Sequence, residues 1–234
     1  MADPTGEGAT RGEGSRRSPS ARLRAASGRP VVSPLHVAPP DRGPADARTD
    51  QRIETELAGW PCHFVTTFGL FSPREIDAGT RLLVAQLAPE PDDDCLDLGC
   101  GYGPIGCYLA ARAPRGRTLM VDRDFVAVDY ALRNAAANGL TNADAMLSNG
   151  LAQVGDRRFD LIASNLPAKV GRELYTIFLE DAWSHLKPGG CFQAVLIRQL
   201  WPALRREAER VFGQVEKQRE GPKHIVFRAR RSAP

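Results

Sequence analysis

A short apolar segment in the middle of this 234-residue chain leads directly into a glycine-rich loop. The segment Cys95–Leu98 is predicted to be a buried strand. Three glycines follow it at alternate positions: Gly99, Gly101 and Gly103. Pro104 comes next and suits the first turn of a helix, where its missing N–H costs nothing. A strand, a glycine turn and a helix in this order indicate an open α/β sheet whose backbone can approach a ligand closely.

The sequence from residue 51 onward alternates between predicted strands and predicted helices. Strands are expected over 64–68, 118–121, 143–147, 159–163 and 191–197, and helices over 76–87, 105–112, 126–138 and 173–186. This alternation predicts a mostly parallel sheet with helices on both faces. Ligands of such sheets bind at the carboxyl ends of the strands, so polar residues there are the first candidates for a functional site.

The first 50 residues differ in composition from the rest. They contain no Phe, Tyr or Trp, and eight arginines stand there among six acidic residues. Such a segment cannot bury enough apolar surface to offset the entropy of ordering it. We therefore expect a disordered tail over 1–50 and one ordered domain over 51–234.

No apolar run approaches the roughly 18 residues of a membrane span, and the N-terminus lacks the apolar stretch of a signal peptide. These features predict a soluble, cytoplasmic protein that does not enter a membrane. The five cysteines include no C-x-x-C pair. Only Cys62 and His63 are adjacent potential metal ligands, so neither a disulfide framework nor a metal site is expected.

The glycine loop alone is compatible with two kinds of cofactor. Residues 101–106 satisfy G-x-G-x-x-G, and Asp122 follows about 20 residues later, as in dinucleotide-binding proteins. Asp97 argues against a dinucleotide, because a carboxylate at the end of the strand would repel a pyrophosphate. The same carboxylate would attract the ammonium and sulfonium groups of S-adenosylmethionine.

Asp122 ends the next predicted strand, where its carboxylate can accept hydrogen bonds from both hydroxyls of a ribose. This role fits either cofactor. The alternative for Asp97 and Asp122 alike is helix capping or an exposed turn. Their joint position at strand ends favours cofactor binding.

The residues of this region resemble motif I of class I S-adenosylmethionine-dependent methyltransferases, Asp97-Leu98-Gly99-Cys100-Gly101-x-Gly103. The resemblance extends to the small methyltransferase domain of the ribosomal-RNA guanine-N2 methyltransferases. Its further segments are Val65-Thr66-Thr67, Phe71-Ser72, Asp77-x-Gly79-Thr80, Ser148-Asn149, Ser164-Asn165-Leu166-Pro167 and Leu186-Lys187-Pro188-Gly189-Gly190. It implies a Rossmann-like fold with a mostly parallel seven-stranded sheet. It also implies S-adenosylmethionine as cofactor, with Asn149 at the adenine.

The segment 164–167 stands where that family has its catalytic Asn-Pro-Pro-aromatic motif. The Asn165 side-chain oxygen and the Leu166 carbonyl can accept the two hydrogens of an exocyclic amine, while Pro167 fixes the loop. The amine lone pair would then point at the sulfonium methyl, so that catalysis is mainly positioning and desolvation. Ala168 replaces the aromatic residue on which the family stacks a base. Phe68, Phe71 or Trp201 are candidates to replace it.

The resemblance implies RNA as substrate, either ribosomal RNA or a ribosomal subunit. Ten Lys and Arg residues against four Glu over 198–231 give modest support, although an ordinary charged helix explains part of this charge. Ala168 leaves open a small-molecule amine or a protein side chain as the methyl acceptor. A non-catalytic binding module and a nicotinamide-dependent dehydrogenase are the remaining alternatives.

Overall fold

The computed structural model describes residues 50–232, so the predicted tail over 1–50 lies outside the described residues apart from Asp50. The strands are β1 (Gln51–Leu57), β2 (Trp60–Thr66), β3 (Cys95–Leu98), β4 (Thr118–Asp122), β5 (Ala143–Leu147), β6 (Phe159–Asn165), β7 (Leu186–Ile197), β8 (Val215–Glu220) and β9 (His224–Arg230). The helices are α1 (Ala78–Val84), α2 (Pro104–Arg112), α3 (Phe125–Ala137), α4 (Arg172–His185) and α5 (Trp201–Phe212), with a short 3₁₀ turn, η1 (Arg198–Leu200).

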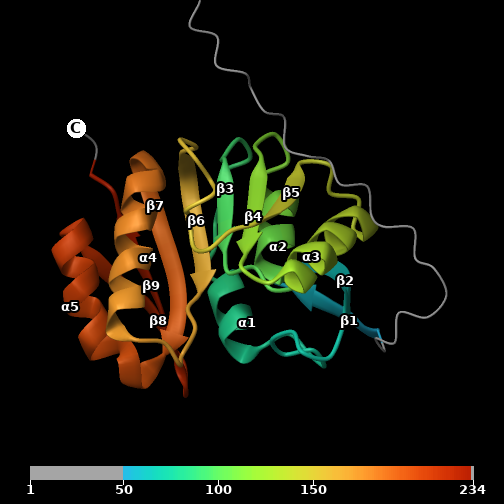
Figure 1. The fold of residues 1–234 in the computed structure, drawn as a ribbon, viewed down its shortest axis with the longest axis horizontal. Helices are drawn as coiled ribbons and strands as arrows, with labels where there is room; N and C mark the ends of the chain where they lie inside the picture. Colours follow the sequence, from blue (N-terminus) through green and yellow to red (C-terminus); the bar gives the residue numbers. More distant parts are fainter. Residues whose placement is uncertain (1–49, 233–234) are drawn as a thin grey trace, which may run out of the picture. The chain divides into compact units, whose positions relative to one another are not determined.

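Seven strands form one sheet in the order β5-β4-β3-β6-β7-β9-β8. The first five are parallel, and β9 runs antiparallel to both of its neighbours. The chain therefore reverses its strand order between β3 and β6, where two neighbouring strands send their following helices to opposite faces (Figure 1). This point is where an open α/β sheet binds its ligand.

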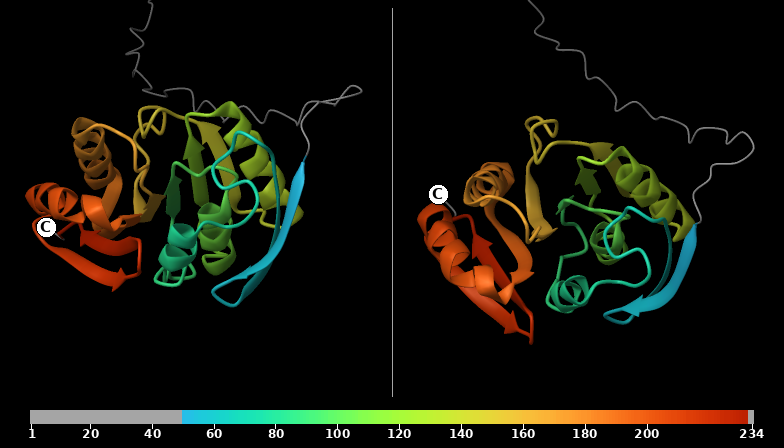
Figure 2. Two further views of the ribbon diagram at one scale, coloured as in Figure 1. Left: turned by 90° about the horizontal axis from the view of Figure 1, so that it is seen from below. Right: turned by 60° about the horizontal axis from the view of Figure 1, so that its bottom comes forward.

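Helices cover both faces of the sheet (Figures 1 and 2). One apolar core lies between the sheet and α1, α2 and α3, and the other between the sheet and α4 and α5. The antiparallel β1–β2 hairpin is a separate two-stranded sheet that closes the first core over α2 and α3. The predicted seven-stranded, mostly parallel fold is confirmed.

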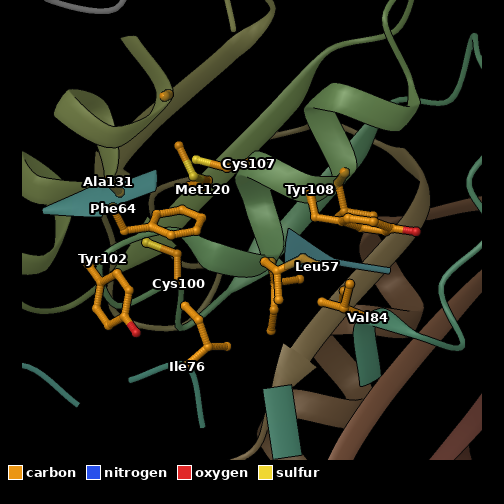
Figure 3. Close-up of a cluster of buried hydrophobic side chains, with 14 of the residues drawn as sticks. Leu57, Phe64, Ile76, Val84, Cys100, Tyr102, Cys107, Tyr108, Met120 and Ala131 are labelled. Atoms are coloured by element: carbon orange, nitrogen blue, oxygen red, sulfur yellow. The ribbon is translucent and has the colours of Figure 1, made fainter. Parts of the chain in front are cut away.

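The first core lies directly beneath the glycine loop. Figure 3 shows Phe64 of β2 beside Met120 of β4, with Cys100 and Tyr102 of the loop close to it. The Phe64 and Tyr102 rings meet edge to face with centroids 5.9 Å apart. Asn134 of α3 adds polar contacts, because its amide bonds the backbone of Val65 and of Tyr102. The hairpin therefore supports the loop from below.

Several predicted elements match in position, and three differ. The expected strand over 64–68 lies earlier, at β2, and Phe68 is in the loop that follows, with 59% of its surface exposed. The helix expected to continue to 186 ends at His185, and the Lys-Pro-Gly-Gly turn residues already belong to β7. Strands β1, β8 and β9 were not predicted. Their exposed faces carry charged residues, which weaken the apolar pattern of a strand.

Within residues 50–232, no helix is long and apolar enough to span a membrane. The same part of the chain contains no cluster of three or more His, Cys, Asp or Glu residues that could hold a metal ion.

Candidate active site

A cavity of about 660 Å³ lies at the carboxyl ends of β3, β4 and β6. Its size falls within the roughly 300–1,000 Å³ of small-molecule and cofactor sites. The predicted residues Gly99, Gly101, Asp122, Asn149, Asn165, Leu166 and Pro167 all line it. The fold thus brings residues from three strand ends together.

The glycine loop forms the floor of this cavity. Gly99, Gly101 and Gly103 have φ angles of +76°, +54° and +92°, a backbone region in which other residues are strained. A Cβ on Gly99 or Gly101 would meet no atom within 4 Å, so the backbone itself faces open space. Gly103 is the N-cap of α2, and a Cβ there would press on Met120. The first two glycines therefore expose the loop to a ligand, and the third lets α2 pack closely.

Asp97 lies beneath the loop and does not line the cavity. Its side chain is fully buried, and Oδ2 accepts a 2.8 Å hydrogen bond from the backbone N–H of Gly106. Burial raises the pKa of its carboxyl to about 7, and the nearby Asp122 carboxylate adds to the rise. Within residues 50–232, its Oδ1 has no hydrogen-bond partner. Direct contact between Asp97 and a cofactor stays a prediction, and the observed contact is with the loop's own helix.

Asp122 ends β4 and lies at the surface of the cavity. Its carboxylate accepts hydrogen bonds of 2.9 Å from the backbone N–H groups of Gly101 and Asp124. It therefore ties the glycine loop to the end of β4 and keeps further lone pairs for a ligand. Asn149 lies past the end of β5, in a turn held by the bond from its N–H to Gln153 Oε1. Both predicted cofactor residues are placed where a bound nucleoside can reach them.

Asn165 is the last residue of β6, and its amide is held from one side. Nδ2 donates to Asp77 Oδ2 at 2.8 Å and to Thr80 Oγ1 at 3.0 Å. The side-chain oxygen is thereby turned away from α1. Asn165 and Leu166 both line the cavity, so the amide oxygen and the next carbonyl are available as paired acceptors.

The loop after Asn165 is anchored by a buried tyrosine. The hydroxyl of Tyr175, on α4, donates a 2.6 Å hydrogen bond to the carbonyl of Pro167. The Leu166 N–H donates to the Val195 carbonyl at 2.9 Å, which joins the loop to β7. Ala168 lines the cavity and offers only a methyl group.

Phe71 is the candidate aromatic that the structure places at the cavity. Its side chain is 66% exposed and lines the opening. Phe68 is also exposed but is not among the lining residues. Trp201 packs against Phe227 in the second core, with ring centroids 5.5 Å apart. Of the three alternatives from the sequence, only Phe71 lies where a stacked ring could be held.

His224 lines the cavity as well, although the sequence did not indicate it as a site residue. It is the first residue of β9 and pairs with Ile197 at the end of β7, so it reaches the cavity from the antiparallel strand. A Cβ on Gly79 would lie between Asp77 and His224. No sequence motif includes His224, because its proximity to Asp77 depends on the pairing of β7 with β9.

Half of the ten basic residues over 198–231 form ion pairs with nearby carboxylates. Arg205 pairs with Glu209, Arg210 with Glu180 and Glu207, Lys217 with Glu220, and Arg228 with Glu216. Arg231 donates to three backbone carbonyls and lies over the Trp183 ring. These contacts favour the interpretation as an ordinary charged surface over a dedicated phosphate-binding stripe.

The cysteine beside the glycine loop is not a reactive thiol. Cys100 is buried, and burial raises its pKa well above the ordinary value for a thiol. The thiolate needed for nucleophilic attack is therefore disfavoured.

The model of the methyltransferase small domain family matches residues 61–228. The chain belongs to this family. The match begins in β2 and ends in β9, so it includes the glycine loop, Asn165 and the antiparallel strand that carries His224. The predicted resemblance is confirmed, and membership of a methyltransferase family gives no support to the nicotinamide-dependent dehydrogenase.

Two bacterial proteins are similar to most of this chain. The uncharacterized protein YbxB of Bacillus subtilis (strain 168) is 31% identical over 171 residues, which is 72% of this chain and 85% of that protein. Ribosomal RNA small subunit methyltransferase C of Pseudomonas aeruginosa (strain UCBPP-PA14) is 33% identical over 189 residues, 78% of this chain and 55% of that protein.

A solved structure with a similar fold is the T. thermophilus 16S rRNA N2 G1207 methyltransferase, determined in complex with AdoMet and guanosine. It aligns with a TM-score of 0.68 and 27% identity, over 78% of this chain and 50% of that one. This chain therefore spans about half the length of the ribosomal-RNA methyltransferases that it matches.

Proposed function

We propose that this family member transfers the methyl group of S-adenosylmethionine to the exocyclic amino group of a guanine in RNA, with ribosomal RNA as the first candidate. The observation that carries the proposal is Asn165, which lines the cavity and whose side-chain nitrogen is bound by Asp77 and Thr80, so that its oxygen is left to accept from a substrate. The similarity to enzymes named for ribosomal-RNA methylation, one of them solved with guanosine, supports the choice of base.

The residues at the cavity fit S-adenosylmethionine. The exposed backbone of Gly99 and Gly101 leaves room above the loop, and a Cβ at either position would occupy it. Asp122 lines the cavity, and the unpaired Oδ1 of Asp97 lies beneath its floor. Carboxylates in these positions suit a ligand with an ammonium and a sulfonium group and disfavour a pyrophosphate. Asp122 would hold the ribose hydroxyls, with Ser148 and Asn149 at the adenine.

The chemistry requires positioning more than acid–base catalysis. S-adenosylmethionine supplies, when bound, a methyl group on an electron-poor sulfur. The Asn165 oxygen and the Leu166 carbonyl accept the two N–H groups of the amine, which sets the direction of its lone pair. Transfer would break the sulfur–methyl bond, whose electron pair would stay on sulfur, and the amine would release one of its two protons to solvent. Removal of water from around the amine would strengthen both hydrogen bonds.

Phe71 would stack against the base, because Ala168 stands where the family has an aromatic residue. Stacking of a base on an aromatic side chain contributes about 1–3 kcal/mol. Phe71 belongs to the loop before α1, so the platform would come from a different segment of the chain than Ala168. Because Phe71 is exposed, an RNA nucleotide can reach it from solvent without a closed chamber.

A small-molecule amine is the second candidate, and Ala168 is the observation that favours it. Without an aromatic at this position, a small acceptor would still meet Asn165 and Leu166. An enzyme that methylates ribosomal RNA would act where ribosomes are assembled, so the first proposal includes a cytoplasmic location.

Incubation with isotopically labelled S-adenosylmethionine tests the proposal. Separate reactions would contain protein-free ribosomal RNA, ribosomal subunits, total tRNA and a metabolite extract. Nuclease digestion and mass spectrometry then identify the methylated nucleoside. We expect label as N2-methylguanosine in RNA. Label confined to metabolites would favour the second candidate and contradict the first.

A further inference from the structure

The side-chain nitrogen of Asn165 has two acceptors, and both come from the start of α1. Nδ2 donates to Asp77 Oδ2 at 2.8 Å and to Thr80 Oγ1 at 3.0 Å, across more than 80 residues of sequence. We propose that Asp77, assisted by Thr80, is a positioning residue that fixes the orientation of the Asn165 carboxamide. This inference rests on the proposed function for the identity of the methyl acceptor, but the orientation itself can be measured without turnover.

Orientation matters because the two ends of a carboxamide have almost the same shape. An asparagine can turn over within the same space, and only its hydrogen-bond partners decide which end points where. An ionised carboxylate is an acceptor only, so Asp77 attracts Nδ2 and repels Oδ1. A reversed Asn165 would present N–H groups to an amine, and two sets of donors would then face each other. Asp77 therefore keeps the acceptor end directed at the substrate.

The same oxygen of Asp77 also starts α1. Asp77 is the N-cap, and Oδ2 accepts a 2.9 Å hydrogen bond from the Thr80 N–H. A Cβ on Gly79 would lie 2.9 Å from this atom, so the glycine leaves the carboxylate room to occupy its position. One carboxylate oxygen thus links the start of α1 to the end of β6. Any movement of α1 would be transmitted to Asn165.

A direct contact with the cofactor is the competing role for Asp77, because the residue lines the cavity. The two roles predict different measurements. A positioning residue changes kcat and leaves cofactor affinity unchanged, whereas a ligand for the cofactor ammonium changes the cofactor Kd. Kd from calorimetry and kcat from steady-state turnover separate them.

Two substitutions keep the helix cap and differ in what they offer Asn165. Serine is a good N-cap, but its hydroxyl is one bond shorter than a carboxylate. In Asp77→Asn the Thr80 N–H can only donate, so the new amide oxygen must face it and can still accept from Asn165. We expect Asp77→Ser to lower kcat at least about tenfold with an unchanged cofactor Kd, and Asp77→Asn to restore kcat to within about fivefold of the wild type. Equal losses in both variants, or a raised cofactor Kd, would overturn the inference.

The matched control is Asp124→Ser, an N-cap exchange at α3. Asp124 caps this helix through a 2.8 Å bond to the Val126 N–H and does not contact Asn165. We expect kcat of this variant to stay within about twofold of the wild type, because a cap exchange between good N-cap residues changes stability little. A tenfold loss here would mean that cap exchange alone explains the Asp77→Ser result and would overturn the inference.

Nuclear magnetic resonance tests the orientation of Asn165 without any substrate. The side-chain NH₂ signals of Asn165 are assigned by their loss in Asn165→Ala. We expect them to shift and to exchange faster with solvent in Asp77→Ser, and to move less in Asp77→Asn. Unchanged signals in Asp77→Ser would overturn the positioning role. If RNA takes up no label but the signals respond as expected, the proposed substrate fails and the positioning of Asn165 stands.

Discussion

The carboxylate of Asp97 accepts a 2.8 Å hydrogen bond from the backbone N–H of Gly106, and the side chain is shielded completely from solvent. The whole glycine loop lies between these two residues in the sequence. Their bond therefore closes the loop, from the strand before it to the first turn of α2. Asp97 therefore holds the glycine loop in shape from below, and its contact with a cofactor remains a prediction.

The raised pKa of Asp97 predicts a pH dependence of stability. Burial raises the pKa from its ordinary value of 3.8 to about 7, so the folded protein binds this proton more tightly than the unfolded chain does. The contribution of the Asp97 carboxyl to the free energy of unfolding therefore falls as pH rises from about 4 to about 7. Above about pH 7 this contribution no longer changes. Asp97→Asn keeps an acceptor for Gly106 and cannot ionise.

Urea unfolding at pH 5, 6, 7 and 8 measures this effect. The stability of Asp97→Asn relative to the wild type should increase by at least about 2 kcal/mol between pH 5 and pH 8. A difference that does not change with pH would contradict the raised pKa. Asp97→Ala removes the acceptor as well, and we expect it to abolish cofactor binding.

The exposed ring of Phe71 predicts a loss that is specific to the acceptor. Phe71→Ala should raise the KM for RNA about tenfold or more, consistent with about 1–3 kcal/mol for one stacked base, and leave the cofactor Kd unchanged. Phe68→Ala is the matched control, since it removes an exposed ring of the same loop outside the cavity. Equal effects of the two variants would argue against a stacking platform at Phe71.

The hydrogen bond from Tyr175 to the Pro167 carbonyl predicts a mild change in turnover. Tyr175→Phe keeps the buried ring and removes only the donor. Pro167 is exposed, so water can bind its carbonyl instead, and we expect a stability loss of only about 1 kcal/mol. Turnover should fall several-fold because the Leu166 carbonyl is held less firmly. Unchanged kcat would show that the loop is positioned without this bond.

The close packing around Gly79 predicts that Gly79→Ala loses activity while it keeps its stability. Alanine is a better helix residue than glycine by about 1 kcal/mol, and Gly79 has an ordinary helical backbone. Its Cβ, however, would lie 2.9 Å from Asp77 Oδ2 and 3.1 Å from His224 Cδ2. Gly79→Ala should therefore keep its thermal stability within about 1 kcal/mol and lose at least about tenfold in kcat. Full activity would mean that Asp77 and His224 can move without consequence.

The strand ends, and therefore the cofactor half of the site, could be predicted from the sequence. Cys95–Leu98 and Ala143–Leu147 were placed at their observed bounds because short apolar segments between turn residues have a clear local pattern. The motif around Asn165 was visible for the same reason. These features depend on residues close together in the chain.

The other half of the site depends on contacts between distant segments. Asp77 meets Asn165 only because α1 lies over the ends of β6 and β7, and His224 enters through the pairing of β9 with β7. Burial of Asp97 and its bond from the Gly106 N–H likewise follow from the packing of α2 on β3. A local sequence pattern does not indicate contacts between segments that are far apart in the chain.

Comparison of the wild type with Asn165→Ala tests the central claim most directly. The measurement pairs the turnover rate, as N2-methylguanosine formed in RNA, with the cofactor Kd of each protein. We predict that kcat falls at least about 10²-fold, the scale of losing one aligned polar contact, and that the cofactor Kd is unchanged. Equal turnover in the two proteins would remove Asn165 from the mechanism and contradict the account.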